Sequence, residues 1–325
     1  MENAKKGEKL NALKNALKGK NTGVFLAFVI LVIALSIATP VFFTGKNLLL
    51  VMRQAVWFAI MGFGMTFVIG MGGIDLSVGS TLALCGLFLA NMILSGVNIY
   101  LAILIVLVLG MLIGFINGLI VAKLKIPDFI TTLSIMSITR GIAMVYSEGL
   151  PIYGLRFPEF QFIGQGYIWV FPVPIIWMLI ICIICYFLMY RTKFGRYTLS
   201  IGSSTDAAKL VGINIDKIKI MVYCLMGLLS AVASVILTSR LEAAMPDAGD
   251  GYELDVIAAT VIGGTSMSGG KASVIGTLIG AIMMAVVRNG LNLLNVNTFW
   301  HQVAIGAIIL IAVVIDQFTT KNANR

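Results

Sequence analysis

The sequence predicts an all-α polytopic membrane protein with about ten transmembrane segments, and three observations support this fold class. Of the 325 residues, 59% are hydrophobic and 11% are charged, whereas soluble domains have about 25% charged residues. Uncharged runs recur along the chain, and the longest covers residues 76–122. A membrane-spanning helix needs roughly 20 apolar residues, so most of the chain is long and apolar enough to cross a bilayer repeatedly.

The basic residues predict the orientation of the chain. The formal net charge is +9, and six lysines lie within the first twenty residues. A further six basic residues lie between Arg191 and Lys219. Cytoplasmic segments of membrane proteins are enriched in lysine and arginine, so both clusters, and the tail with Lys321 and Arg325, are expected inside. This distribution favours membrane topology over nucleic-acid binding as the reason for the charge.

Apolar periods and turn clusters divide the chain into elements. We expect a cytoplasmic amphipathic segment at 1–22, a membrane domain at 23–317 and a cytoplasmic tail at 318–325. The expected spans are about 23–42, 48–70, 79–95, 99–121, 129–146, 169–190, 220–239, 256–270, 272–287 and 298–316. The segments 256–270 and 272–287 are short for a span. Counted as crossings they give ten segments, which we adopt, and counted as a re-entrant hairpin they give eight.

Two short glycine-rich stretches interrupt the apolar runs in the same way. "GGIDLSVG" (72–79) and "GGTSMSGG" (263–270) share Gly, Gly, Ser and Gly at four of eight positions. Paired, glycine-interrupted segments in the two halves of a transporter indicate a substrate path. The residues expected to line or brace such a path are Gly72, Gly73, Asp75, Ser77, Ser80, Thr265, Ser266, Asn289 and Asn292.

Asp75 is the most informative single residue, because an ionised carboxylate is costly at membrane depth. One interpretation makes Asp75 or Ser77 the cap of the third span, accepting backbone N–H bonds. The other makes Asp75 a direct substrate contact, and the two interpretations are compatible.

Other polar residues fall near membrane depth. They are Arg140, Asp255, Arg288, Asn289, Asn292 and His301. The run "RNGLNLL" (288–294) could contact sugar hydroxyls, but hydrogen bonding between helices is the interpretation we favour. The single histidine excludes a multi-histidine metal site. The four cysteines lie in apolar runs and are expected to pack. We find no metal motif and no catalytic constellation, so an enzyme is not expected.

The cytoplasmic stretch 191–219 contains a candidate short helix, "DAAKLV", followed by glycine. Thr205 is the expected N-cap and Asp206 a favourable first-turn charge. Gly212 should end the helix. Ala207 and Ala208 present a small surface to which another protein could dock, although composition alone is equally consistent with a connector.

Three separated runs resemble one family. They are "GGIDLSVGS" (72–80), "GYELDVIAATVIGGTSMSGGKASVIGT" (251–277) and "RNGLNLLNV" (288–296). Over roughly residues 45–317 the chain resembles permease subunits of ATP-binding-cassette importers, in the branch that handles ribose and related monosaccharides. The resemblance implies a bacterial cytoplasmic-membrane importer that works by alternating access.

The resemblance also implies partners. Asp206, Ala207, Ala208 and Gly212 resemble the family's Glu-Ala-Ala coupling loop, with aspartate in place of glutamate. With Thr205 and Ile213 beside them, they would sit in a cleft of a separate ATPase subunit. That subunit would hold ATP and magnesium, and this chain would bind no cofactor. A second permease copy is implied, as is an extracytoplasmic sugar-binding protein docking on loops 147–168 and 241–254.

Alternatives remain for the cargo and the energy source. The same importer type could carry a nucleoside, an autoinducer-type furanosyl compound or branched amino acids. An ion-coupled secondary transporter also uses broken helices, but it should contain coupling carboxylates in the bundle, where only Asp75 and Asp255 qualify.

Overall fold

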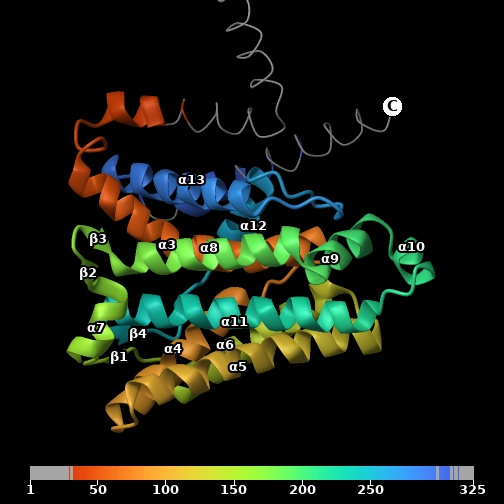
Figure 1. Cartoon of the computed structure of the whole chain (residues 1–325). Helices are drawn as coiled ribbons and strands as arrows, with labels where there is room; N and C mark the ends of the chain where they lie inside the picture. The colour runs from red at the N-terminus through yellow and green to blue at the C-terminus, as the bar shows by residue number, and fades with distance from the viewer. Residues whose placement is uncertain (1–28, 30–31, 298–299, 308–309, 311–313, 315–325) are drawn as a thin grey trace, which may run out of the picture.

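The computed structural model describes residues 29, 32–297, 300–307, 310 and 314 (Figure 1). The predicted segment 1–22 and the tail 318–325 lie outside the described residues, as do much of the predicted spans 23–42 and 298–316. The described part of the chain is a helical bundle with two very short strand pairs.

The helices follow one another with short connections. In chain order they are α3 (Gly45–Gly70), α4 (Val78–Leu94), α5 (Ile99–Leu119) with its π-helical extension η1 (Ile120–Leu124), α6 (Asp128–Tyr146), α7 (Pro158–Gln165), α8 (Val173–Arg191), α9 (Lys193–Ser203), α10 (Thr205–Leu210), α11 (Ile215–Leu241), α12 (Tyr252–Ile262) and α13 (Val274–Leu293). The strands β1 (Ile152–Tyr153) and β4 (Ala243–Ala244) pair antiparallel, as do β2 (Tyr167–Ile168) and β3 (Phe171–Pro172).

Six described helices are long and apolar enough to cross a membrane, namely α3, α5 with η1, α6, α8, α11 and α13. The shorter apolar helix α4 has 17 residues and α12 has 11. The chain is therefore a polytopic, all-helical membrane protein. The expectation that 272–287 is too short for a span is wrong, because α13 continues through Arg288 and Asn289 and reaches 20 residues. The charge at Arg288 had ended the apolar run, but it does not end the helix.

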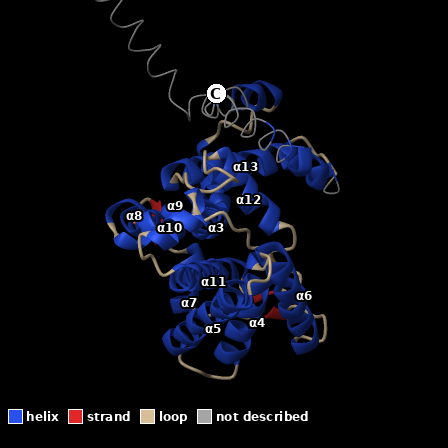
Figure 2. Ribbon diagram, turned by 90° about the vertical axis from the view of Figure 1, so that its right-hand side faces the viewer, coloured by secondary structure: helices blue, strands red, loops and turns tan. Residues whose placement is uncertain are grey.

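The burial of the spans separates a core from a periphery. Two thirds of the apolar windows of α3 and α11 are buried (67% each), against 28% for α5 and 22% for α6. Figure 2 shows two groups of helices, with α3, α8, α12 and α13 in one and α4, α5, α6, α7 and α11 in the other. Because α3 and α11 pack against both their own group and each other, these two helices form the core of the bundle.

Glycines allow α5 and α11 to approach closely. A Cβ added to Gly110 or Gly114 of α5 would overlap the α11 backbone at Gly227 and Tyr223. Small residues at such contacts let helix backbones meet directly in a membrane. The opposite side of α5 exposes large aliphatic side chains, as expected for a surface that faces lipid.

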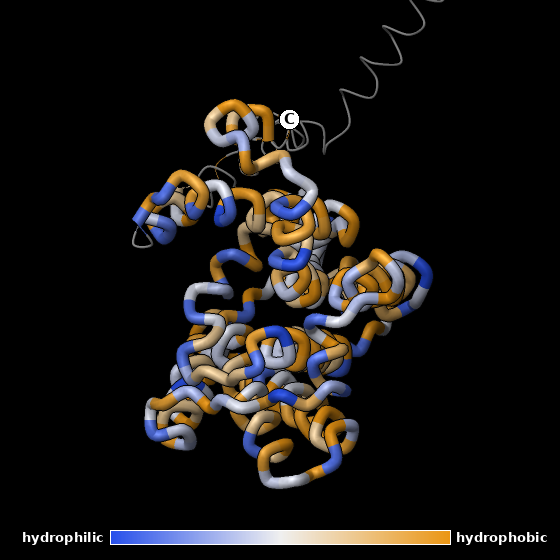
Figure 3. Tube along the Cα trace, turned by 90° about the vertical axis from the view of Figure 1, so that its left-hand side faces the viewer, coloured by the Kyte–Doolittle hydropathy of each residue, from blue (hydrophilic) through white to orange (hydrophobic). Residues whose placement is uncertain are grey.

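The two ends of the bundle differ. α9 and α10 project from one end, and α7 with the four strands lies at the other (Figure 1). Figure 3 views the molecule from the strand end, where hydrophilic residues are mainly in the connections between helices. We call these the α10 end and the strand end.

Candidate functional site

The first break lies between α3 and α4, where residues 71–77 are non-helical. Gly72 has φ +89°, a left-handed conformation that glycine adopts without strain. The amides of Gly72 and Gly73 donate to the carbonyl oxygens of Ile69 and Val68, at 2.8 and 2.9 Å. These bonds satisfy carbonyls at the end of α3, so the glycine pair ends the helix and lets the chain turn.

Asp75 is 2% exposed and organises this turn. Its Oδ1 accepts from the Ser77 amide at 2.8 Å and from Ser77 Oγ at 2.6 Å. Asp75 therefore accepts a backbone N–H at the start of α4, as the capping interpretation predicts. Of the two alternatives, Asp75 supplies the accepting side chain; Ser77 occupies the N-cap position, but its side chain caps no amide of α4. Its hydroxyl donates to Asp75 and accepts from Asn117 Nδ2 at 2.8 Å instead.

Neighbouring helices bind to the same turn. Ser80 Oγ donates to the Ser77 carbonyl at 3.0 Å and accepts from Thr139 Oγ1 of α6 at 2.7 Å. Asn117 of α5 is fully buried. Sequence reasoning missed Asn117 and Thr139. The signal was an asparagine within a strongly apolar helix, "FINGL", which needs a hydrogen-bond partner at membrane depth.

Tyr223 and Asp128 close the turn on its other side. Tyr223 of α11 is fully buried, and its hydroxyl donates to Asp128 Oδ2 at 2.7 Å. Thr132 Oγ1 donates to the carbonyl of Ile74 at 3.4 Å. A Cβ on Gly73 would overlap the Asp128 carboxylate, so a larger residue there would displace this side chain of α6. Neither Tyr223 nor Asp128 was among the predicted path residues.

The second break lies between α12 and α13, where residues 263–273 are non-helical. Gly264, Gly269 and Gly270 have φ values of +90°, +79° and +75°. Thr265 is fully buried, and its Oγ1 accepts from the Ser273 amide at 3.2 Å. Ser266 is also buried, and its amide donates to the Lys271 carbonyl at 3.0 Å. Both breaks are thus compact turns whose buried polar groups bond to the surrounding chain.

The second break contacts the end of α3, directly before the first break. The Gly270 amide donates to the Gly70 carbonyl at 2.9 Å. Gly202 of α9 lies against the same point, since a Cβ there would overlap the Gly70 carbonyl oxygen. The end of α3, the second break and the helix preceding α10 therefore share one tight glycine junction.

Asn289 and Asn292 lie elsewhere. Asn289 is 15 residues beyond the start of α13, roughly 22 Å along the helix. It exchanges two amide hydrogen bonds with Asn47 of α3, at 3.0 and 2.9 Å. This is the interhelical bonding favoured from the sequence. Asn292 is exposed. The structure does not bring either residue to the two breaks.

The remaining flagged residues have local partners. Arg140 donates to the carbonyl oxygens of Pro246 and Ala248, at 2.7 and 2.9 Å. His301 is 4% exposed, and its Nε2 bonds the Val296 carbonyl at 3.2 Å. All four cysteines are free thiols. The described residues contain no group of three or more metal-ligating side chains.

The predicted short helix exists as α10, with one correction. Its N-cap is Ser204, whose side chain accepts from the Ala207 amide at 3.2 Å, and not Thr205. Thr205 is the first helical residue, and its hydroxyl bonds back to Ile201 of α9. The run "SST" (203–205) contains three adjacent hydroxyl side chains that could cap the helix. The N-cap is the middle one, Ser204, which follows directly after the end of α9. Asp206 lies in the first turn as predicted.

The end of α10 also matches the prediction. Gly212 has φ +81°, and the amides of Gly212 and Ile213 donate to the carbonyls of Lys209 and Ala208. Ala207 is exposed, whereas Ala208 is buried against the bundle. Sequence reasoning missed the apolar pair Leu210 and Val211, which are 88% and 76% exposed at the tip.

A group of arginines and aromatic rings occupies the half of the bundle nearer the strand end. The Arg240 guanidinium lies 4.8 Å from the Trp57 ring centroid. Arg288 pairs with Asp255 and lies 5.6 Å from the ring of Phe58. We call the residues Arg53, Gln54, Trp57, Phe58, Arg240, Tyr252, Asp255 and Arg288 the arginine–aromatic cluster. Of these, only Asp255 and Arg288 were flagged from the sequence.

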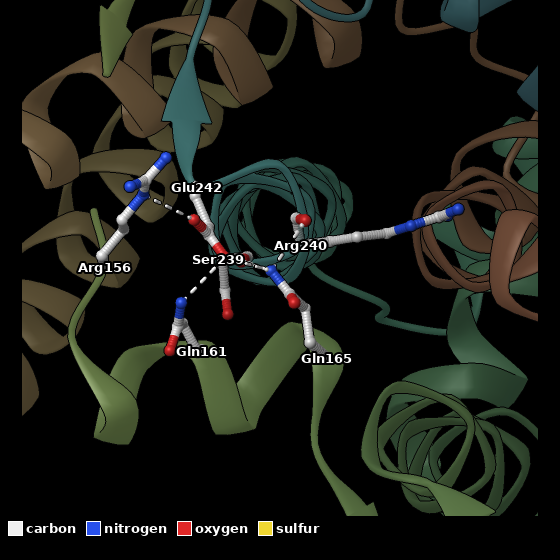
Figure 4. Close-up of polar contacts among 6 residues, drawn as sticks. All are labelled: Arg156, Gln161, Gln165, Ser239, Arg240 and Glu242. Carbon is white, nitrogen blue, oxygen red and sulfur yellow. Dashed lines mark hydrogen bonds and ion pairs between the residues drawn. The ribbon is translucent and has the colours of Figure 1, made fainter. Parts of the chain in front are cut away.

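At the strand end, Glu242 holds α7 against α11 (Figure 4). Gln165 and Gln161 donate to its Oε1 at 3.0 and 2.8 Å. Arg156 Nε lies 3.5 Å from its Oε2. The hydrogen bonds from Gln165 and Gln161, with the charge of Arg156, hold the pKa of the Glu242 carboxyl below its usual value. The Arg240 side chain points away from this network (Figure 4).

The described part of the chain has six apolar spans, two non-helical breaks beside a shared junction, and an exposed helix at one end. Together these features define a multi-pass membrane transport protein. The chain belongs to the family described as branched-chain amino acid transport system / permease component, which it matches over residues 47–313. It is a membrane permease and not an enzyme.

Curated relatives cover nearly the whole chain. The ribose import permease protein RbsC of Bacillus subtilis (strain 168) is 48% identical over 91% of this chain and 92% of its own length. RbsC of Haemophilus influenzae is 46% identical over 90% and 92%. The L-arabinose transport system permease protein AraH of Escherichia coli (strain K12) is 37% identical over 92% and 91%. No solved structure matches the chain significantly.

Proposed function

We propose that this chain is the membrane permease of an ATP-driven importer for ribose or a closely related monosaccharide. The assignment of the cargo rests on one observation, the difference in sequence identity between this chain and its relatives. Ribose permeases are 43–48% identical to this chain, whereas the permeases named for D-allose and L-arabinose are both 37% identical. Each of these permeases is named for a sugar, so we assign a monosaccharide as the class of cargo. Within that class, the higher identity to ribose permeases favours ribose.

The ATPase partner would dock on the stretch 191–219. α10 projects from the bundle, and Thr205, Asp206 and Ala207 are exposed on it. Leu210 and Val211 add an apolar tip, and exposed apolar side chains of this kind mark partner contacts. The Gly212–Ile213 end fixes where the helix stops. ATP and magnesium would be held by the partner, and this chain would contribute only the docking surface.

The proposed docking of the ATPase on α10 also sets the orientation of the chain in the membrane. With α10 inside, both termini would be cytoplasmic and the strand end would face outward, consistent with the basic residues of 191–219. Ten crossings then require α12 with the following turn, and the predicted spans 23–42 and 298–316, to traverse the membrane. The β1–β4 pairing brings loops 147–168 and 241–254 together. They would form one surface for an extracytoplasmic sugar-binding protein, and a second permease copy would complete the transporter.

The mechanism proposed is alternating access. Movement of α10 by the ATPase would reach the glycine junction through α9, because Gly202 lies against Gly70 and Gly270. The residues at or beside the two breaks would then line or brace the path at its α10 end; they are Gly72, Gly73, Asp75, Ser77, Ser80, Thr265 and Ser266. Asn289 and Asn292 would act nearer the strand end. Changes of this kind repack discrete elements and do not deform a core continuously.

The proposal is tested by uptake of labelled D-ribose into proteoliposomes. The chain alone is compared with the chain plus its ATPase and binding protein, with and without ATP. Uptake only in the complete system with ATP is the expected result. Uptake by the chain alone under an ion gradient would instead identify a secondary transporter. Competition by unlabelled ribose, allose and arabinose orders the cargoes, and stronger competition by allose or arabinose would overturn the assignment of ribose.

A further inference from the structure

The arginine–aromatic cluster contains buried polar atoms that the fold leaves unpaired. Six such atoms have no hydrogen-bond partner within the described part of the chain. They are Arg53 Nε, Gln54 Oε1, Trp57 Nε1, Arg240 Nη1, Asp255 Oδ1 and Arg288 Nε. Only two other side-chain atoms share this state among the described residues, Asn117 Oδ1 and Thr131 Oγ1. Buried polar groups in native proteins are normally paired, so this concentration in one region needs an explanation.

The six atoms come from one contiguous group of side chains. Arg53 and Gln54 lie four and three residues before Trp57 on α3, so the side chain of each is a neighbour of the Trp57 side chain. Arg240 of α11 lies over the Trp57 ring, 4.8 Å from its centroid. On the adjoining side, the rings of Phe58 and Tyr252 are 5.0 Å apart.

The ring centroids of Trp57 and Phe58 are 5.9 Å apart, and this contact joins the two sides of the group. Arg288 lies on the side of Phe58. Its guanidinium lies within 5.6 and 5.8 Å of the Phe58 and Tyr252 rings, and it forms an ion pair with Asp255. The carboxylate of Asp255 is fully buried, and only its Oδ2 is used by that pair. One oxygen therefore remains as an unpaired acceptor beside a fixed cation.

The chemistry of the unpaired atoms defines the ligand class. Four of them are N–H donors, and two, Gln54 Oε1 and Asp255 Oδ1, are acceptors. A phosphate or carboxylate anion could use the donors, and the three arginines would attract it, but it has no hydrogen to donate and would leave both acceptors unpaired. A hydroxyl group both donates and accepts, so a polyhydroxyl molecule can satisfy both kinds of atom at once. Flat aromatic and guanidinium groups beside these atoms suit the apolar faces of a sugar ring.

The cluster lies in the part of the bundle toward the strand end. Trp57 lies twelve residues from the start of α3, about 18 Å along the helix. Arg288 lies five residues before the end of α13, and Arg240 one residue before the end of α11. Arg53, Gln54 and Arg240 are partly exposed even though their unpaired atoms are buried.

We infer that the arginine–aromatic cluster is an outer binding subsite for a monosaccharide, which the sugar occupies before it reaches the two glycine breaks. Arg53, Trp57, Arg240 and Arg288 would donate to its hydroxyl oxygens, and Gln54 and Asp255 would accept from its hydroxyl groups. This inference rests on the proposed function, since it places a sugar-binding step within the transport path.

Cysteine protection tests occupancy of the subsite directly. A Gln54→Cys variant of the permease, assembled with its ATPase in lipid nanodiscs, is reacted with a water-soluble thiol reagent. The unsubstituted chain measures the background from the four native cysteines. D-ribose at about 100 mM, well above a millimolar Kd, should slow modification several-fold. A matched Val170→Cys variant, 67% exposed at the same end, should be modified at the same rate with and without ribose.

A conservative substitution tests the energetic contribution. Trp57→Phe keeps a ring under Arg240 and removes only the indole N–H. Loss of one hydrogen bond should raise the KM for ribose uptake about 3- to 10-fold in the complete transporter, with maximal uptake rate unchanged. Trp177→Phe on α8, 43% exposed, is the control. A merely structural role for Trp57 would lower the amount of assembled transporter and leave KM unchanged.

The outcomes separate this inference from the function on which it rests. Ribose uptake by the complete system, together with no protection of Cys at position 54, would overturn the subsite and leave the importer assignment in place. Protection by inorganic phosphate but not by ribose would show that an anion occupies the cluster and would also overturn it. Failure of the complete system to import any sugar would overturn the proposed function itself.

Discussion

The backbone amide of Gly270 donates a hydrogen bond to the carbonyl oxygen of Gly70 at 2.9 Å. This contact joins the end of α3 to the turn between α12 and α13, two segments 200 residues apart in the chain. Gly202 of α9 lies against both residues, so closely that a Cβ at position 202 would overlap the Gly70 carbonyl and the Gly270 amide. The two glycine-rich breaks are therefore parts of one junction, and α9 connects that junction to the exposed helix α10.

Gly202→Ala should disturb this junction. An added methyl group would overlap the Gly70 carbonyl and crowd the Gly270 amide, and overpacking of this kind destabilises by about 1–3 kcal/mol. Denaturation of the purified chain in detergent measures the change. Gly141→Ala on α6 is the control, because a Cβ there meets nothing within 4 Å. Equal stability of the two variants would contradict a tight contact at Gly202.

Asp75→Ala should destabilise the turn and reduce transport. The substitution leaves the Ser77 amide and hydroxyl without their acceptor in a buried site, at about 1–3 kcal/mol for each unsatisfied group. Asp216→Ala is the matched control, because Asp216 pairs with Lys123 at 2.8 Å on the surface. Exposed pairs contribute at most about 1 kcal/mol. An Asp75→Ala chain that assembled and transported normally would refute the role assigned to Asp75.

The Asn47–Asn289 pair should show measurable coupling between α3 and α13. Asn47→Leu and Asn289→Leu each leave the other amide without two reciprocal hydrogen bonds. The double variant should be less destabilised than the sum of the single variants, by about 0.6 to 1.7 kcal/mol for a bond within a membrane bundle. A double-mutant cycle of denaturation free energies in detergent checks this, and strict additivity would show that the pair contributes nothing.

Replacing both Leu210 and Val211 by Ser should weaken binding of the ATPase subunit. Burial of a large aliphatic side chain is worth about 1.5–3 kcal/mol, so loss of the pair should weaken binding tenfold or more. Pull-down of the ATPase with the purified permease measures this. The thermal stability of the permease alone should not change, because both side chains are exposed. Leu150→Ser, 65% exposed at the strand end, is the control and should leave ATPase binding unaltered.

Acidification should loosen the contact between α7 and α11. The pKa of Glu242 is held below its usual value by Gln165, Gln161 and Arg156. A depressed carboxyl pKa stabilises the fold above the unfolded-state pKa, and this stabilisation is lost as the pH falls through the folded-state pKa. The unfolding temperature of the native chain should therefore fall more steeply below the usual glutamate range than that of Glu242→Gln. Glu148→Gln, another exposed site at the strand end, should follow the native chain.

Much of the fold could be predicted from local sequence. The apolar runs placed α5, α6 and α8 to within a few residues, because the free energy of crossing a bilayer depends on composition over about 20 residues. Glycine pairs marked both breaks, because their backbone conformations are accessible to glycine almost alone. Errors arose at charges and caps. The predicted span ended at residue 287, before Arg288, but α13 continues through this charge. The predicted N-cap of α10 was Thr205, but the N-cap is Ser204.

The site was predicted less completely, because its contacts cross between helices. Asp75 was identified as buried and polar, but its connection to Asn117 depends on how α5 packs against α4. Tyr223 and Asp128 gave no local signal at all. Hydrogen bonding between helices was favoured for Asn289, but its partner Asn47 could not be named from the sequence, and its distance from the breaks depends on the fold.

The sequence by itself determined the class of protein, the apolar spans of α5, α6 and α8, the two breaks and the short helix α10, because each depends on hydrophobicity or backbone preference over a short window. Only the tertiary structure decided that the end of α3 meets the second break at Gly70, Gly202 and Gly270, and that six unpaired polar atoms belong to the arginine–aromatic cluster. The physical reason is that helices apolar on all sides carry little periodicity to show which face packs against which neighbour. Close packing and buried hydrogen bonds between distant segments make that choice.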